Sequence, residues 1–148
     1  MNGETAGMLD RLADAGLRAT RTRKALAALL FNGKTRYVTA EQLHRQATAT
    51  TKVSLATVYN TLKTFTKHGL LQEVVVDPGR SFFDTNVTDH YHFYCEDKRA
   101  LVDIPVDVGI LLRLSARRRD IAIRRVDPII RIRSGKKNTG AAVSDLAQ

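Results

Sequence analysis

The stretch SLATVYNTLKTFTKHGLL, residues 54–71, has the pattern of one amphipathic helix. Ser54 is a residue type that caps helix N-termini, and Gly69 is a type that ends them. Apolar side chains recur at helical spacing and predict one buried face: Leu55, Val58, Tyr59, Leu62 and Phe65. The opposite face carries small, hydrogen-bonding and cationic residues: Ala56, Thr57, Asn60, Lys63, Thr64 and Lys67. Such an exposed face suits a helix that lies in the major groove of DNA.

The residues that follow this helix change to a β-type pattern. The runs LLQEVVV (70–76) and SFFDT (81–85) lie on either side of Asp77-Pro78-Gly79-Arg80. Proline followed by glycine at the two central positions is typical of a tight turn, because proline fixes φ and glycine accepts a positive φ. The pattern therefore predicts a hairpin directly after the helix, in the place of the wing of a winged helix-turn-helix.

Three further helices are expected before residue 54. The first has the apolar stripe Met8, Leu9 and Leu12, and Gly16 stands where it ends. The second runs from its capping residue Thr20 to Asn32, and the third begins at Thr39, which forms a capping-box pattern with Gln42. We expect His44 to face solvent on the third helix and His68 to interact with the C-terminus of the helix at 54–68.

The second half of the chain predicts a smaller mixed region. HYHFYC and ALVDI read as strands joined by a turn at EDKR, and a short helical or irregular stretch VDVGILLRLS follows. A last strand covers IAIRRVDPIIRIR, where Pro128 indicates an edge or a bulge. The fold class is therefore α+β, with an N-terminal winged-helix domain at 1–86, a second domain at 87–133 and a disordered tail at 134–148.

Charge is distributed unevenly along the 148 residues, whose formal net charge is +9. Residues 1–80 carry +6, residues 81–112 carry −4 and residues 113–148 carry +7. The basic first block favours a polyanionic partner. The acidic middle block holds two of the four histidines, and carboxylates with imidazoles are ligands for borderline divalent metals.

Cysteine content and hydropathy indicate the compartment. Cys95 is the single cysteine, so no disulfide forms within the chain, and we expect a buried packing role for it. The N-terminus lacks a signal-peptide pattern, and no apolar run approaches membrane length. We expect a cytoplasmic protein with no membrane partner.

Four segments together resemble the ferric uptake regulator superfamily, and most closely its bacterial iron response regulator branch. They are GLRATRTR (16–23), YVTAEQLH (37–44), SLATVYNTLKTFTKHGLL (54–71) and FFDTNVTDHYHFYC (82–95). The resemblance spans residues 8–133. It implies a winged-helix domain followed by an α/β dimerisation domain, and a homodimer bound to double-stranded operator DNA with an inverted repeat.

The resemblance also implies DNA-contacting residues. The recognition helix of the family falls on residues 54–68, with Thr57, Tyr59 and Asn60 at DNA-facing positions. Arg18 matches a basic residue that reaches the minor groove, and Arg23 matches an arginine at a helix start. From the helix pattern itself, Asn60 suits adenine, and Thr57 and Lys63 suit bases or phosphates.

The regulatory metal site of the superfamily falls on Asp84, His90, His92 and Asp103. Two histidines at i and i+2 project from the same face of a strand. Such donors suit zinc, iron(II) or manganese(II), and the imidazole pair His90 and His92 could instead ligate haem iron. This chain departs from the family at Tyr37, which replaces a hinge-region histidine, and at Tyr91, which interrupts the histidine run.

The function that the resemblance implies is an iron- or haem-responsive transcription regulator, active under iron limitation and inactivated by haem, with haem or a haem-delivering protein as a further partner. The alternative within the same fold is a repressor that senses a divalent metal or peroxide. An enzyme such as a metal-dependent hydrolase is not expected, because the chain has no nucleophile–base pair, glycine-rich phosphate loop or HExxH motif. A nonspecific DNA packager would bind every duplex equally, whereas a regulator prefers its operator.

Overall fold

The computed structural model describes residues 3–88, 90–104 and 129–133. The chain divides into two compact units, Met1–Val87 and Thr88–Gln148. Several sequence predictions lie outside the described residues: the stretch 106–115, the part of the last strand at 121–128 with Pro128, and the tail 134–148. In the described part of the chain, no helix is long and apolar enough to cross a membrane.

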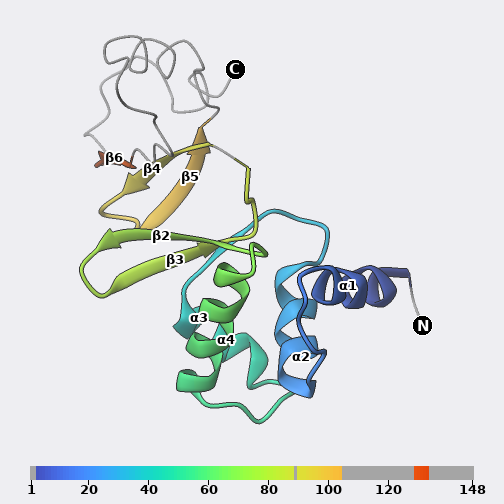
Figure 1. The fold of residues 1–148 in the computed structure, drawn as a ribbon. Helices are drawn as coiled ribbons and strands as arrows, with labels where there is room; N and C mark the ends of the chain where they lie inside the picture. Colours follow the sequence, from blue (N-terminus) through green and yellow to red (C-terminus); the bar gives the residue numbers. More distant parts are fainter. Residues whose placement is uncertain (1–2, 89, 105–128, 134–148) are drawn as a thin grey trace, which may run out of the picture. The chain divides into compact units, whose positions relative to one another are not determined.

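The first unit combines four helices with a three-stranded antiparallel sheet (Figure 1). Its helices are α1 (Gly3–Asp14), α2 (Arg21–Leu30), α3 (Ala40–Ala47) and α4 (Leu55–Lys67). Its strands are β1 (Tyr37–Val38), β2 (Gln72–Asp77) and β3 (Arg80–Asp84), in the order β1-β3-β2. The predicted hairpin is confirmed: β2 and β3 pair on either side of Pro78 and Gly79, and Gly79 has a φ of 75°.

Three helices of this unit begin at the predicted capping residues. The side chains of Thr20, Thr39 and Ser54 accept hydrogen bonds from the backbone amides of Arg23, Gln42 and Thr57. At Thr39 the capping box is complete, because the Gln42 side chain accepts from the Thr39 amide at 2.9 Å. Each such cap contributes about 1 kcal/mol to stability. The polar residues before each helix therefore fix where it starts.

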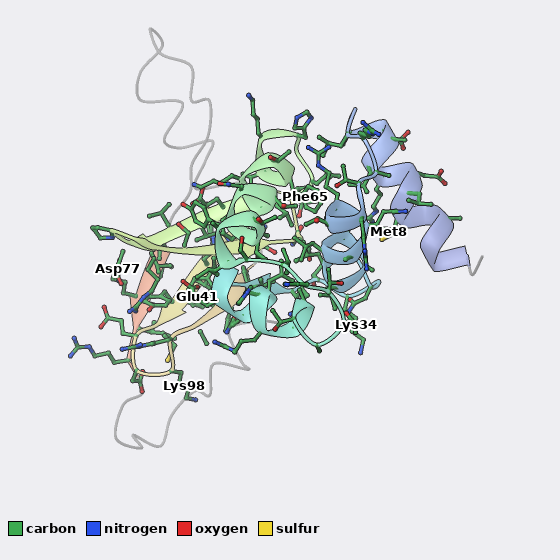
Figure 2. The ribbon with its side chains drawn as sticks, turned by 90° about the horizontal axis from the view of Figure 1, so that it is seen from below. Met8, Lys34, Glu41, Phe65, Asp77 and Lys98 are labelled. Atoms are coloured by element: carbon green, nitrogen blue, oxygen red, sulfur yellow. The ribbon has the colours of Figure 1, made fainter. Side chains whose placement is uncertain are left out.

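The core of the first unit is mostly apolar; its buried polar side chains are Thr61, Gln72 and Asp84. Its largest fully buried side chains come from all four helices and from the sheet: Leu12, Leu26, Leu30, Leu43, Leu62, Phe65, Val38, Val58 and Phe83. Figure 2 shows Met8 of α1 and Phe65 of α4 on the sides of their helices that face other helices. Phe65 packs against Phe31 with ring centroids 6.2 Å apart. The core thus fixes which face of α4 remains at the surface.

The structure corrects four details of the sequence predictions in this unit. Helix α2 ends at Leu30, two residues before the predicted end. Strand β1 was not predicted, because two residues are too short to show a period. Leu55 and Tyr59 do not join the buried face of α4; they are 41% and 42% exposed. His44 does not simply face solvent, because it is half-buried and its Nε2 lies 3.0 Å from the Val53 carbonyl oxygen.

The described part of the second unit is a mixed sheet of three strands. It consists of β4 (Tyr91–Cys95), β5 (Ala100–Ile104) and β6 (Ile129–Ile132), in the order β5-β4-β6. Strands β4 and β5 are antiparallel and follow the predicted strand–turn–strand pattern. Strand β6 runs parallel to the central strand β4, with His92 opposite Ile129.

Candidate nucleic-acid interface and metal-ligand site

The surface face of α4 carries the predicted polar side chains. Ala56, Thr57, Asn60, Lys63 and Lys67 are exposed. Four residues hold the opposite face in the core: Val58, Thr61, Leu62 and Phe65. This separation of faces matches the sequence prediction apart from Leu55 and Tyr59, which are exposed, and Thr64, which is half-buried. Because Tyr59 is exposed, it lies on the side that the family resemblance assigns to DNA.

Asn60 is the side chain on this face with the greatest free hydrogen-bonding capacity. Neighbouring hydroxyls are engaged within the helix: Thr61 donates to the Thr57 carbonyl, and Thr64 donates to the Asn60 carbonyl. Thr57 meets the capping residue Ser54, with the two hydroxyl oxygens 2.9 Å apart. Among the described residues, the Asn60 amide has no hydrogen-bond partner. Its oxygen and its NH₂ group are therefore both available to a base edge.

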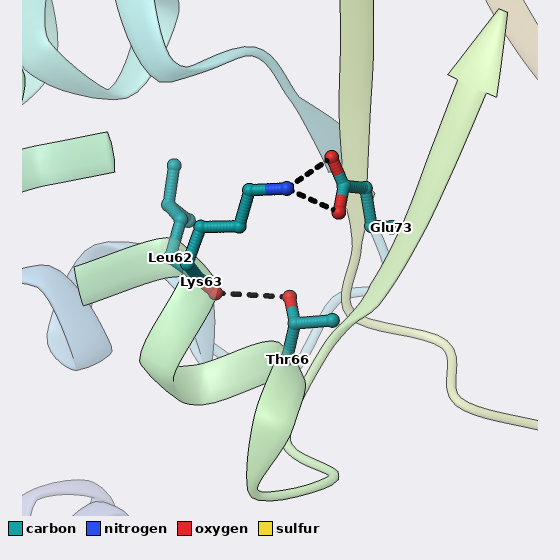
Figure 3. Close-up of polar contacts among 4 residues, drawn as sticks. All are labelled: Leu62, Lys63, Thr66 and Glu73. Carbon is teal, nitrogen blue, oxygen red and sulfur yellow. Dashed lines mark hydrogen bonds and ion pairs between the residues drawn. The ribbon is translucent and has the colours of Figure 1, made fainter. Parts of the chain in front are cut away.

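Lys63 is already engaged in an ion pair. Its Nζ donates to both carboxylate oxygens of Glu73 on β2, at 2.9 and 2.7 Å (Figure 3). Burial of Glu73 acts to raise its pKa, but the hydrogen bonds from Lys63 and Ser81 outweigh this effect and hold the pKa of Glu73 below its ordinary value. The hydrogen bond to Glu73 raises the pKa of Lys63. The pair therefore ties the exposed face of α4 to the β2–β3 hairpin.

Tyr59 links the same ion pair to the sheet. Lys63 Nζ lies 5.4 Å from the centre of the Tyr59 ring, within cation–π range. The Tyr59 ring meets Phe83 of β3 edge-on, with centroids 6.4 Å apart. Sequence reasoning missed this arrangement, because Glu73 lies ten residues after Lys63 and beyond the end of the helix.

The two predicted arginines are connected at the start of α2. Arg18 lies in the loop before the helix and its side chain is exposed. The guanidinium of Arg23 donates to the Arg18 carbonyl at 3.0 Å. Arg23 therefore holds the backbone that carries Arg18.

Two histidines support the helices instead of facing a ligand. The His44 bond to the Val53 carbonyl joins α3 to the loop before α4. His68, at the C-terminal cap of α4, donates from Nδ1 to the Ala15 carbonyl just after α1, at 2.9 Å. The predicted contact of the His68 ring with the C-terminus of its own helix is wrong in its partner, because the ring bonds the carbonyl that follows α1.

Asp84 ends β3 in the first unit. It is buried, its backbone stands opposite Tyr37 on one side and Gln72 on the other, and its carboxylate accepts from the Asn86 amide at 2.8 Å. The carboxylate is thus held by the backbone that follows the strand.

The two predicted histidine ligands lie together in the second unit. The rings of His90 and His92 are buried, with centroids 4.5 Å apart and planes at 62°. Their nitrogens lie within 4.8 Å of one another. A carbonyl can only accept, so His90 Nδ1 donates to the Thr88 oxygen at 2.6 Å. In the neutral ring Nε2 is then the deprotonated nitrogen, and a histidine ligates a metal through a nitrogen in that form.

Asp103 is placed by its strand register. Its backbone on β5 stands directly opposite that of His92 on β4, so a predicted carboxylate ligand and a predicted imidazole ligand lie at the same level of the sheet. Cys95 is buried as predicted, and its thiol donates to Asp97 at 3.0 Å. The donor chemistry of His90 and His92 fits a divalent cation, since imidazole nitrogen is a ligand common to zinc, iron and manganese sites.

Known proteins match most of the chain. Residues 14–121 match the ferric uptake regulator family. The peroxide operon regulator of Bacillus subtilis (strain 168) is 34% identical over 96 residues, which are 64% of this chain and 66% of that protein. The peroxide-responsive repressor PerR of Staphylococcus aureus (strain Mu50 / ATCC 700699) is 33% identical over 93 residues, 62% of each protein. The chain thus spans slightly less than two thirds of the length of these curated relatives.

A solved structure is similar over a longer range. The ferric uptake regulator from Pseudomonas aeruginosa with manganese has a TM-score of 0.70 and 26% sequence identity, and the match covers 87% of this chain and 98% of that one.

Proposed function

The chain belongs to the ferric uptake regulator family, and we propose that it is a metal-responsive transcription regulator that binds operator DNA as a homodimer. One observation carries the proposal. Helix α4 presents exposed Thr57, Tyr59 and Asn60 on one face and is anchored by a fully buried face on the other. The hairpin β2–β3 follows it directly, as the wing follows the recognition helix in a winged helix-turn-helix.

In this proposal α4 enters the major groove. The unengaged amide of Asn60 bonds adenine in bidentate fashion, and Thr57 and Tyr59 contact neighbouring bases or the backbone. Arg18 reaches a narrow A·T-rich minor groove from the loop before α2, and Arg23 fixes that loop through its bond to the Arg18 carbonyl. Lys63 lies on the same face, with its ammonium held by Glu73.

We further propose that His90 and His92 bind the regulatory cation. The Thr88 carbonyl bonds Nδ1 of His90, which sets the tautomer that a ligand through Nε2 needs. Asp103, at the level of His92, and Asp84, at the end of β3, are the proposed carboxylate ligands. A bound zinc, iron(II) or manganese(II) ion would add positive charge at these side chains. In this proposal, binding of the ion changes the affinity of the protein for DNA. The names of the similar proteins support this role, since one solved neighbour is described with manganese and the curated relatives as peroxide regulators.

Haem is the second candidate ligand, supported by the resemblance of residues 82–95 to the iron response regulator branch. The ring geometry favours a small cation. Two imidazoles on opposite faces of one haem iron hold their ring centres about 6 Å apart, because each nitrogen lies about 2 Å from the metal. The rings of His90 and His92 are 4.5 Å apart, which suits ligands on one side of an ion.

The proposal of a homodimer is supported by an apolar row on the sheet of the second unit. Val102, Phe93 and Ile130 stand opposite one another across β5, β4 and β6. Val102 and Ile130 are 45% and 44% exposed. A row of exposed apolar side chains across a sheet fits burial against a second copy of the chain.

The test begins with selection of duplexes from random-sequence DNA by the full chain in the presence of manganese. An enriched A·T-rich inverted repeat supports the proposal, and binding of all duplexes with equal affinity contradicts it. Binding of the selected duplex is then measured with manganese, with iron(II) before and after peroxide, and with hemin. Metal-dependent affinity that His90→Ala/His92→Ala removes supports the cation, whereas a hemin absorption band that the same variant weakens supports haem.

A further inference from the structure

The strongest unassigned feature of the first unit is the contact among Lys63, Glu73 and Tyr59. Lys63 stands on the DNA-facing side of α4, where a free ammonium would bind phosphate. Its Nζ is instead chelated by both carboxylate oxygens of Glu73. Figure 3 shows the lysine side chain extending from α4 towards the strand that carries Glu73, away from the Leu62 carbonyl, which accepts from Thr66.

The geometry points to Glu73 as a positioning residue that withholds Lys63 from DNA phosphates and keeps its ammonium against the ring of Tyr59. This inference rests on the proposed operator-binding function and assigns Lys63 a role other than the direct DNA contact expected from sequence. As a consequence, the bases are recognised by neutral side chains on α4, namely Tyr59, Asn60 and Thr57.

The carboxylate of Glu73 is well placed for this role. Its side chain is much less exposed than that of Lys63, 18% against 43%, so it is the fixed partner and the lysine is the one that adapts. Ser81 on β3 also acts to lower the pKa of the Glu73 carboxylate. The depressed pKa of Glu73 keeps it ionised, and the raised pKa of Lys63 keeps the ammonium charged.

Two contacts orient the Tyr59 ring, one with Lys63 and one with Phe83. The Lys63 ammonium lies 5.4 Å from the ring centre, and Phe83 meets the ring edge-on. An exposed tyrosine without such contacts samples several rotamers, and ordering it on binding costs free energy. The ion pair therefore orders Tyr59 before the ring contacts a base. It also neutralises the charge of Lys63, which would otherwise add affinity for every DNA sequence.

The experiment measures the salt dependence of DNA binding for four proteins: wild type, Lys63→Met, Glu73→Gln and the double variant. The probes are the duplex selected by the wild-type protein and a scrambled duplex of equal length. Each phosphate contact changes the slope of log affinity against log salt by about 0.9. Lys63→Met is expected to leave the slope unchanged and to lower the preference for the selected duplex roughly two- to five-fold, the scale of an exposed cation–π contact.

Glu73→Gln is expected to steepen the slope by about 0.9 per protomer, because the released lysine gains a phosphate. The double variant is expected to return to the wild-type slope. If it keeps the steeper slope, the effect comes from the lost negative charge alone and the inference is overturned. A flatter slope in Lys63→Met that the double variant shares also overturns it, because Lys63 then contacts phosphate in the wild type.

Arg18→Met serves as the positive control, with an expected flattening of the slope by about 0.9 per protomer. Thermal unfolding of each variant confirms that it is folded, and the exposed position of the pair makes a folding failure of Lys63→Met unexpected. If the wild-type protein enriches no sequence at all, the proposed function fails. If it enriches a sequence and only the slopes disagree, this inference alone fails.

Discussion

The sheet β1-β3-β2 of the first unit and the sheet β5-β4-β6 of the second both contain three strands, but they place polar side chains differently. The first sheet keeps an ion pair at the surface, between Lys63 and Glu73, and buries one carboxylate, that of Asp84, beside a core of apolar side chains. The second buries the imidazoles of His90 and His92. The apolar core of the first unit should therefore fold without an ion, and the histidine pair of the second unit is where a bound ion would change stability most.

The largest expected effect concerns the apolar core of the first unit. Phe65→Ala removes a fully buried ring near the C-terminal end of α4 and should lower the free energy of unfolding by about 3–5 kcal/mol. Hydrogen exchange followed by mass spectrometry should show the loss in α1–α4 and leave β4 and β5 unchanged. Leu55→Ala, at an exposed position of the same helix, is the control and should cost less than about 1 kcal/mol. Equal losses in both units would show that they unfold as one.

The next effect belongs to the second unit. Manganese or zinc at about one hundred times its Kd should stabilise β4 and β5 by about 2.7 kcal/mol, because only the folded site binds the ion. The same hydrogen-exchange measurement checks this, with protection expected in peptides that contain residues 90–104.

The matched control for the metal effect comes from the supporting histidines. His90→Ala/His92→Ala should abolish the protection, whereas His68→Gln should retain it, since His68 bonds only a carbonyl near α1. Protection that survives in the double variant would remove these two histidines from the site.

Both units show that contacts between residues close in sequence could be predicted. Helix starts in the first unit depend on neighbours three residues apart, as at Ser54 and Thr57, so the caps were predictable. The i, i+2 spacing of His90 and His92 on a strand likewise predicted a shared face. Local spacing was sufficient in both cases.

Non-local contacts were not predictable. Strand β1 forms only because Tyr37 and Val38 find β3, far along the chain, and β6 pairs with β4 in parallel across a similarly long separation. Helical periodicity predicted a buried Tyr59, but spacing alone does not determine which way an aromatic side chain at that position turns. What settles its orientation is Lys63, held by Glu73 from another element, and the edge of Phe83.

A smaller effect concerns the surface of α4. Asn60→Ala should cost roughly 1–3 kcal/mol of operator affinity at one base position in each half-site, because its unengaged amide is the proposed reader of adenine. Competition between the selected duplex and single-base variants measures this loss. Asn32→Ala, at an exposed asparagine outside α4, is the control and should leave base preference unchanged. Normal discrimination by Asn60→Ala would contradict the assignment of this face to DNA.

The smallest expected effect separates the surface pair from the buried residues. Glu73→Gln should lower the free energy of unfolding by less than about 1 kcal/mol at neutral pH, because solvent screens an exposed pair. The pKa of Glu73 is lowered in the folded state, so the contribution of the pair is fully present above the ordinary value of 4.5 and is lost as pH falls through the folded-state pKa. Urea unfolding of wild type and variant from neutral pH to below pH 4.5 measures the difference, which should shrink towards zero on acidification. A difference that persists in acid would mean that the neutral hydrogen bonds of Glu73, including that from Ser81, hold the hairpin, and that charge has little part in it.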